Sequence, residues 1–434
     1  MKKAAVLFLF FVILCGTLVY GESAYQSPPD NNAKAAMVYN LDTDQIIYEK
    51  NIHDKIYPAS ITKIMTAVLL LEHITDFEDT VEVSKALDYS DLIIGSSTAN
   101  LQDGEKLTYD QLLKCIMISS ANEACNTAAR YVAGSLEAFI EMMNEKAKEL
   151  GLKNTHFVNT HGLPDDDHYT TAYDVLLLTK YALTVNGFEK YCNLTSFELP
   201  PLENQTRKYY TTNNLIMKNR GEKTYFKYAK GIKTGTTKAA GSCVVSYADN
   251  DKTRYMTLVF GEKIDDDGTK HAFTTAKALF EWAYDNHKVS QIIVPNDPLA
   301  EIKVKNGKGK DFASLSADKK YSVVLKNGED KDDVIEITTE VTKEAAAPIE
   351  KDVIYGYAKV LYSGKEIMSI PLYSNEALER SEILYALSLA KEFFSNPITI
   401  IVCIILVLLV IWYIVLMFKR NRRKYKKVRR KIRF

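Results

Sequence analysis

Ser60 and Lys63 are the first pair of residues whose types and spacing indicate chemistry. They stand three residues apart at the expected start of a helix, a spacing that places a hydroxyl and an amine on one helix face. An amine with a lowered pKa can accept the hydroxyl proton, which makes Ser60 a nucleophile toward a carbonyl carbon and Lys63 its general base. Backbone N–H groups that are unpaired at a helix start can stabilise the developing oxyanion. By themselves, the two residues also fit a capping serine and a surface lysine.

Ser120 and Asn122 form a second polar group, and they interrupt an apolar helical pattern. Packing alone favours apolar side chains in a buried element, so the interruption predicts a site. Ser120 can relay a proton to a leaving nitrogen, and Asn122 can hold both Lys63 and a substrate amide. Viewed alone, the segment also fits an ordinary loop between two helices. The apolar positions before it are Leu112, Leu113, Ile116, Met117 and Ile118.

The third motif is Lys233-Thr234-Gly235-Thr236, which precedes a strand-like run. Gly235 lets a substrate backbone approach closely, as on an edge strand that receives an extended peptide. Lys233 supplies positive charge, while Thr234 and Thr236 can bond a terminal carboxylate and peptide groups. The N–H of Thr236 is a candidate second oxyanion donor. We therefore predict that these residues bind the substrate.

The three motifs, in this order, resemble those of the low-molecular-weight penicillin-binding proteins, the serine-type D-Ala-D-Ala carboxypeptidases of peptidase family S11. The resemblance implies a mixed α/β penicillin-binding/β-lactamase-like transpeptidase domain followed by a β-rich domain. It also implies an acyl-enzyme on Ser60, release of the terminal D-alanine from peptidoglycan stem pentapeptides, inhibition by β-lactam antibiotics, and no cofactor. Further runs that carry the resemblance are 58–66, 157–163, 168–174 and 231–237.

The chain departs from the family pattern in two places. The family commonly has an arginine shortly before the tryptophan of its last catalytic-domain helix, where it grips the substrate carboxylate. Before Trp282 this chain has Lys270 and His271 instead, so each is a candidate anchor. Many relatives also end in an amphipathic helix on the membrane, whereas this chain continues into an uncharged segment long enough to span a bilayer.

Two alternative functions share these motifs. A β-lactamase-like hydrolase needs a carboxylate for deacylation, and the Glu-x-x-Leu-Asn that supplies it in the related class is absent from the sequence. We therefore expect a long-lived acyl-enzyme with penicillin. A catalytically silent wall-binding protein keeps the fold without the chemistry, and the intact Ser60, Lys63, Ser120 and Lys233 argue against it.

Apolar periodicity predicts an α/β first part and a β-rich second part. Residues 35–49 have the alternation and the Asp-Thr-Asp turn of a hairpin, and 60–72 have the spacing of a strongly buried helix after Pro58. Short strand-like runs separated by Asn-Gly and Ser-Gly turns begin near residue 289 and predict a small antiparallel domain. Further helices are expected at 109–118, 135–150, 172–184 and 274–285, and strands at 243–247 and 255–260.

Both ends of the chain have the composition of membrane or export segments. Lys2 and Lys3 precede an uncharged run, the layout of a secretory signal, with an uncleaved anchor as the alternative. Residues 398–418 carry no charge and are followed by a cluster of Lys and Arg, which stays cytoplasmic by the positive-inside rule. We therefore expect a single-pass protein of the cell membrane whose catalytic domain lies outside the cytoplasm.

These features divide the sequence into six segments. The predicted segments are a signal peptide at 1–24, the carboxypeptidase domain at 25–288, the β-rich domain at 289–373, an amphipathic helical linker at 374–397, a transmembrane helix at 398–418, and a basic cytoplasmic tail at 419–434.

The charge distribution excludes nucleic acid as a partner. The formal net charge is zero, but the two ends hold 13 of the 55 Lys and Arg. The rest of the chain has 42 basic against 55 acidic residues. A body of that sign lacks the clustered cations that phosphate binding needs.

Neither the histidines nor the cysteines indicate a metal site. His156, His161 and His168 match no common zinc spacing, and the runs 165–167 and 265–267 lack the alternating acids of an EF-hand. The chain has no Cys-x-x-Cys. Four cysteines are expected to be buried small apolar residues, with disulfides as the alternative in an oxidising exterior. They are Cys115, Cys125, Cys192 and Cys243.

Overall fold

The computed structural model describes residues 25–202 and 205–431, so the predicted signal peptide at 1–24 lies outside the described residues. The described chain forms two compact units. One comprises residues up to 290 together with 322–331, and the other comprises 291–321 together with the residues from 332 onward. These units differ from the predicted boundary at 288 chiefly in the segment 322–331, which packs with the first unit.

An antiparallel five-stranded sheet forms the centre of the first unit. Its strands are β1 (Ala35–Asn40), β2 (Gln45–Lys50), β7 (Ala229–Thr237), β8 (Gly241–Asp249) and β9 (Arg254–Glu262), in the order β2-β1-β9-β8-β7. The predicted hairpin is present as β1 and β2, and the Asn40 side chain accepts hydrogen bonds from the N–H groups of Asp42 and Thr43 in its turn. Ala35 of β1 lies opposite Phe260 of β9, so the start of the unit pairs with a strand from its far end.

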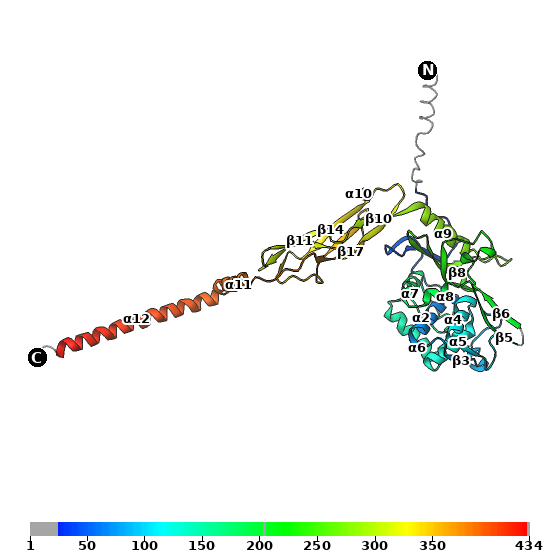
Figure 1. The fold of residues 1–434 in the computed structure, drawn as a ribbon, viewed down its shortest axis with the longest axis horizontal. Helices are drawn as coiled ribbons and strands as arrows, with labels where there is room; N and C mark the ends of the chain where they lie inside the picture. The colour runs from blue at the N-terminus through cyan, green and yellow to red at the C-terminus, as the bar shows by residue number, and fades with distance from the viewer. Residues whose placement is uncertain (1–24, 203–204, 432–434) are drawn as a thin grey trace, which may run out of the picture. The chain divides into compact units, whose positions relative to one another are not determined.

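Helices cover both faces of this sheet (Figure 1). They are α2 (Lys63–His73), α3 (Lys85–Asp88), α4 (Tyr109–Lys114), α5 (Asn122–Ala133), α6 (Leu136–Glu149), α7 (Ala172–Thr184), α8 (Phe188–Cys192) and α9 (Ala272–Asn286). Met37 and Tyr39 of β1 pack into the core formed with α2 and α7, whereas Val38 packs into a second core with α9. Because side chains of a strand alternate between its faces, the sheet is the middle layer of three.

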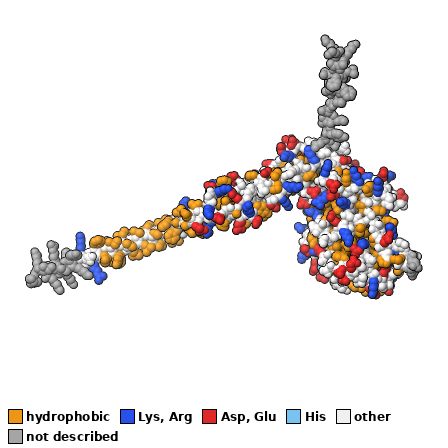
Figure 2. Space-filling model, in the orientation of Figure 1, with side chains coloured by type: hydrophobic (Ala, Val, Ile, Leu, Met, Phe, Trp, Pro, Cys, Tyr) orange, Lys and Arg blue, Asp and Glu red, His pale blue; other side chains and the backbone are white. Residues whose placement is uncertain are grey.

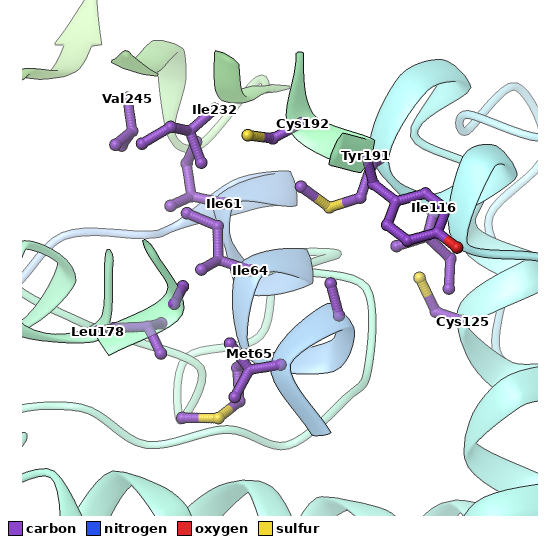
Figure 3. Close-up of a cluster of buried hydrophobic side chains, with 14 of the residues drawn as sticks. Ile61, Ile64, Met65, Ile116, Cys125, Leu178, Tyr191, Cys192, Ile232 and Val245 are labelled. Carbon is purple, nitrogen blue, oxygen red and sulfur yellow. The ribbon is translucent and has the colours of Figure 1, made fainter. Parts of the chain in front are cut away.

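Helix α2 is buried on nearly all sides. Ile64 and Met65 have no exposed surface and lie near Leu178 of α7, while Ile61, just before the helix, faces Ile232 of β7 (Figure 3). Packing on so many sides fixes the rotation of the helix about its axis. The residues at its N-terminus are therefore held in one orientation.

The predicted helix at 109–118 is divided in the structure. Helix α4 ends at Lys114 and continues into a π-helical turn, η2 (Cys115–Ser119), after which Ser120 adopts a left-handed conformation with φ of 60°. Helix α5 then begins at Asn122 and was not predicted. Its buried residues mix small apolar side chains, among them Ala124, Cys125 and Ala128, with the polar side chains of Asn122 and Asn126.

Three two-stranded sheets complete the first unit and its boundary. They are formed by β3 (Thr80–Glu82) with β4 (Lys106–Thr108), β5 (Ser196–Leu202) with β6 (Gln205–Tyr210), and β10 (His287–Ile293) with β13 (Tyr321–Lys326). Two 3-10 turns, η3 (Asn214–Ile216) and η4 (Lys218–Arg220), lie between β6 and β7.

The second unit contains a six-stranded sheet with the order β14-β16-β17-β12-β11-β15. Its strands are β11 (Ala300–Lys305), β12 (Phe312–Ser316), β14 (Ile335–Val341), β15 (Glu344–Ala346), β16 (Ile354–Tyr362) and β17 (Lys365–Ser374), and the short helix α10 (Lys331–Val334) precedes β14. All pairings are antiparallel, as predicted, except that of β11 with β15. The short strands β12 and β15 were not predicted.

Two helices, α11 (Glu382–Ser395) and α12 (Pro397–Lys431), end the described chain. The amphipathic helical linker predicted at 374–397 begins later, because Ser381 caps the helix and the preceding residues bond to the turn after β11. There, Lys308 N–H donates to the Glu379 carbonyl. In the part of the chain that the structure describes, only Pro397–Arg422 is a helix long and apolar enough to cross a membrane. Figure 2 shows its side chains as a continuous hydrophobic surface.

Candidate active site

Ser60 lies in a 3-10 turn, η1 (Ala59–Thr62), immediately before α2. The helix predicted from Ser60 thus starts with a tighter turn, and α-helical residues begin at Lys63. Ala59 has a φ of 47°, in the left-handed region that residues with a Cβ seldom occupy. Ser60 is the partly exposed residue of this otherwise buried turn. Its hydroxyl therefore lies where a substrate can reach it.

The amine of Lys63 is fully buried and contacts oxygen atoms from three parts of the chain. Its Nζ lies 3.0 Å from Ser60 Oγ, 2.7 Å from Asn122 Oδ1 and 2.7 Å from the backbone oxygen of His161. Three partners match the three directions an ammonium group can donate. The structure thus brings Ser60, Lys63 and Asn122 together as expected, and adds a carbonyl that sequence reasoning missed.

Lys233 connects the other two motifs. Its buried Nζ donates to Ser120 Oγ at 3.0 Å and to the backbone oxygen of Thr234 at 3.1 Å. The left-handed conformation of Ser120, after the π-helical turn, is the local feature that turns the chain between α4 and α5. Residues 113 positions apart in the sequence are therefore in direct contact.

Strand β7 lies at an edge of the sheet, as predicted, and it packs on the Ser60 turn. A Cβ on Gly235 would lie 2.9 Å from the Ala59 Cβ and 3.0 Å from the Ser60 nitrogen. Sequence reasoning attributed this glycine to the approach of a substrate, but the chain's own turn occupies the space beside it. The hydroxyl of Thr234 lies 2.6 Å from that of Thr212, and Thr236 is exposed.

Burial lowers the pKa of both lysines. The pKa of Lys63 falls to about 8 because desolvation disfavours its charged form. The pKa of Lys233 lies well below its ordinary value for the same reason, and the charge on Lys63 lowers it further. The lowered pKa gives Lys63 a larger neutral fraction than an exposed lysine has at the same pH. The neutral form is the protonation state a general base requires.

A tight loop at residues 159–163 supplies the carbonyl that contacts Lys63. Asn159 Oδ1 accepts a hydrogen bond from Gly162 N–H at 2.6 Å, which closes the loop. Gly162 has a φ of 90°, and a Cβ there would lie 1.8 Å from the backbone oxygen of Ala59. The loop therefore contacts both the Ser60 turn and the Lys63 amine. Its His161 was considered in the sequence only as a zinc ligand, and no sequence signal marks a backbone carbonyl.

Lys270 and His271, the two candidate anchors for a carboxylate, have different surroundings. His271 Nε2 lies 2.6 Å from Asp265 Oδ2. The pKa of Lys270 is lowered by desolvation and by the charge of Arg220. The charge of Lys270 in turn contributes to the low pKa of Lys233. Lys270 therefore belongs to a group of cations with Arg220 and Lys233, whereas the His271 ring is bonded to the Asp265 carboxylate.

His156, His168 and the four cysteines outside the membrane segments lie in surroundings that indicate structural roles. His168 Nε2 lies 2.8 Å from Thr62 Oγ1, and burial lowers the pKa of His168 to about 3. His156 Nδ1 lies 2.7 Å from the Asp167 backbone oxygen. The four cysteines outside the membrane segments are buried thiols without disulfides, the first of the two options considered. They are Cys115, Cys125, Cys192 and Cys243.

Two family models match the chain. Residues 22–264 match the family model described as D-alanyl-D-alanine carboxypeptidase, and 288–380 match that of the penicillin-binding protein 5 C-terminal domain. The chain belongs to the D-alanyl-D-alanine carboxypeptidase family. The predicted fold class, an α/β penicillin-binding domain with a β domain and a long apolar helix behind it, is thereby confirmed.

Several bacterial D-alanyl-D-alanine carboxypeptidases are similar to most of the chain. The D-alanyl-D-alanine carboxypeptidase DacF of Bacillus subtilis is 31% identical over 354 residues, which are 81% of this chain and 87% of the relative. DacC of Escherichia coli is 30% identical over 378 residues, 85% and 90% of the two chains. The structure of penicillin-binding protein 5 from Haemophilus influenzae matches the fold with a TM-score of 0.69 at 22% identity, covering 82% of this chain and all of that one.

The loop contact at Gly162 leads to a testable expectation. Gly162→Ala places a methyl group inside contact distance of the Ala59 carbonyl, so the Ser60 turn and the loop must move apart. Gly95→Ala is the matched control, because Gly95 has a similar φ of 84° and no atom near its added Cβ. We expect Gly162→Ala to reduce the unfolding free energy by about 1–3 kcal/mol more than the control, from overpacking alone. Thermal unfolding of the full chain in detergent measures both; equal losses contradict the proposed contact.

Proposed function

We propose that the protein is a penicillin-sensitive serine D-Ala-D-Ala carboxypeptidase that removes the terminal D-alanine from peptidoglycan stem peptides. The observation that carries the proposal is the environment of Lys63 Nζ. Two carbonyl oxygens, of Asn122 and His161, lie 2.7 Å from it, and the Ser60 hydroxyl lies 3.0 Å away. A neutral amine has two N–H bonds and one lone pair. When the carbonyls accept the two N–H bonds, the lone pair faces the hydroxyl.

In the acylation step, Ser60 Oγ attacks the carbonyl carbon of the penultimate residue while its proton passes to Lys63. The negative charge that develops on the substrate oxygen is stabilised by the backbone N–H groups of Ser60 and Thr236. Collapse of this intermediate breaks the C–N bond. Water then hydrolyses the acyl-enzyme and restores the Ser60 hydroxyl.

The nitrogen of the leaving D-alanine must receive a proton when that bond breaks. Ser120 is the proposed relay, because its Oγ is within hydrogen-bond distance of the Lys233 amine at 3.0 Å. Ser120 donates its own proton to the nitrogen and accepts one from the Lys233 ammonium, while Lys63 keeps the proton taken from Ser60, so the total charge of the site is unchanged. Asn122 holds Lys63 in this scheme and also faces the substrate amide.

Substrate selection is proposed to follow from the buried cations. The positive potential at Lys233, to which Lys270 contributes, favours binding of a carboxylate. Thr234 and Thr236 on the edge strand are proposed to bond the carboxylate and the peptide. Lys270 is the proposed carboxylate anchor in place of the family arginine, since the His271 ring is bonded to Asp265.

The C-terminal helix is proposed to anchor the enzyme in the cell membrane. Its uncharged segment, 398–418, lies within the helical span Pro397–Arg422 and meets the length that a bilayer requires. The Lys and Arg that follow are expected to remain cytoplasmic, which leaves the catalytic domain outside. The peptidoglycan substrate is present on that side.

Incubating the full chain in detergent micelles with a D-Ala-D-Ala-ended peptide and, separately, with a fluorescent penicillin tests the function. We expect release of D-alanine and a stable penicillin adduct on Ser60, both lost in Ser60→Ala. Rapid penicillin turnover would instead indicate a β-lactamase-like hydrolase. Absence of both D-alanine and adduct in the wild type would indicate a catalytically silent protein.

The pH dependence of the reaction tests Lys63 as the base. The base must be unprotonated in the free enzyme, and the unprotonated fraction rises as the pH rises through the pKa of about 8. We therefore expect kcat/KM for D-alanine release to increase with pH to a midpoint near 8. A profile that is flat through that pH contradicts the assignment.

Removal of the Lys270 charge tests the carboxylate anchor. Lys270→Ala is expected to raise KM about tenfold or more, because a hydrogen bond to a charged group contributes about 1.5–3 kcal/mol. Lys270→Arg keeps the charge and should retain a KM near that of the wild type. Lys252→Ala, in the turn between β8 and β9, is the control for loss of an exposed lysine. An unchanged KM in Lys270→Ala excludes this role.

A further inference from the structure

Asp91 lies outside all three sequence motifs, yet its carboxylate is bonded to the loop that contacts Lys63. Asp91 Oδ2 lies 3.0 Å from His161 Nε2. The His161 side chain is 1% exposed, whereas that of Asp91 is 39% exposed. The pair therefore connects a buried ring beside the site to a residue at the protein surface.

The hydrogen bonds fix the tautomer of His161. Its Nδ1 accepts a hydrogen bond from the Leu163 backbone N–H at 3.2 Å, so Nδ1 carries no proton. The single proton of a neutral ring must then be on Nε2, where it is donated to Asp91. Burial lowers the pKa of His161, and the neighbouring Lys63 charge acts in the same direction, although Asp91 opposes both. The contact is therefore an orienting hydrogen bond from a neutral ring.

A second connection fastens Asp91 to the same loop. Asp91 Oδ1 accepts a hydrogen bond from Asn126 Nδ2 at 2.7 Å. The other end of that amide, Asn126 Oδ1, accepts from Thr160 Oγ1 at 2.5 Å. One carboxylate thus holds two consecutive loop residues, His161 directly and Thr160 through Asn126.

Both of these loop residues contact α2 through their backbone carbonyls. Thr66 Oγ1 donates to the Thr160 carbonyl at 2.5 Å, and Lys63 Nζ donates to the His161 carbonyl at 2.7 Å. Thr66 is three residues after Lys63, so the two contacts lie on one face of the helix. A displacement of the loop would move the acceptor that orients the Lys63 amine.

We propose that Asp91 is a positioning residue for the Lys63 amine, acting through the ring and backbone carbonyl of His161. The inference rests on the proposed function, in which Lys63 is the base. An exposed ion pair contributes little to stability and would leave the chemistry unchanged. The Asp91 contact differs because its partner is a buried neutral ring whose own carbonyl touches the catalytic amine.

Asp91→Asn is the sharpest test because it keeps the size of the side chain and removes one acceptor. The Asp91 carboxylate accepts from both His161 Nε2–H and Asn126 Nδ2–H, whereas an amide must turn its NH2 toward one of these donors. One of the two bonds is lost in either orientation. We expect the rate of Ser60 acylation by saturating fluorescent penicillin, measured by stopped flow, to fall about tenfold or more through misplacement of the base. The half-saturating penicillin concentration should change little, since Asp91 is not proposed to touch the ligand.

The pH profile of acylation supplies a readout that a merely structural role does not move. A carbonyl acceptor favours the ammonium form of Lys63, so loosening the His161 carbonyl lowers the midpoint of the acid limb. The other titratable or charged groups that affect the pKa of Lys63, or whose own pKa it affects, are Cys125 and Glu123 of α5, Lys233 of β7, and His161 and His168. Asp91→Asn leaves all of these groups in place.

Two further variants complete the experiment. Asp103→Asn makes the same change in the same connection between α3 and β4, where Asp103 accepts a hydrogen bond from the Lys85 N–H. This control should acylate like the wild type. Asp91→Glu restores a carboxylate at a different reach and should recover part of the rate. The proposal is overturned if Asp91→Asn acylates as fast as Asp103→Asn, if its half-saturating concentration rises instead, or if Asp91→Glu is no faster than Asp91→Asn at equal melting temperature. Failure of the wild type to form any adduct would refute the proposed function itself.

Discussion

Removal of the Lys63 amine from water is the constraint on which the rest of the site depends. Desolvation lowers the pKa of the amine to about 8, and the same desolvation requires a partner for each N–H. The partners are the oxygens of Asn122 and His161 and the Ser60 hydroxyl, which come from three separate segments. An amine with fewer buried acceptors would be more costly to bury, and an amine with a carboxylate partner would be a poorer base.

The surrounding fold meets this constraint with backbone conformations in the left-handed region. Ala59, Ser120 and Gly162 all have positive φ, and each lies beside the site. Such conformations persist only where neighbouring structure holds them. Here the buried helix α2 and the edge strand β7 supply that support, because both contact the Ser60 turn directly. The site is thus an arrangement of strained turns on rigid elements.

The sheet of the second unit and helix α12 are stabilised by different interactions from those of the site. The sheet of the second unit has a buried face and an exposed face, so its strands alternate in the ordinary way. The span within helix α12 has no buried residues, and its apolar surface has no partner in the described chain. A lipid bilayer is the environment that makes such a surface favourable. Charge and hydropathy, rather than packing, therefore account for helix α12.

The sequence by itself determined the features that depend on local pattern. The buried helix after Pro58, the hairpin of β1 and β2, the edge strand with Lys233 and the apolar C-terminal helix all follow from spacing and composition. Tertiary structure alone decided the features in which polar groups are satisfied at long range. Helix α5 buries the polar side chains of Asn122 and Asn126, whose partners Lys63, Thr160 and Asp91 come from distant parts of the sequence. The contact of Lys63 with the His161 carbonyl uses a group that every residue possesses. Side-chain types can indicate a nucleophile and a base, but only the folded backbone determines which carbonyl orients them.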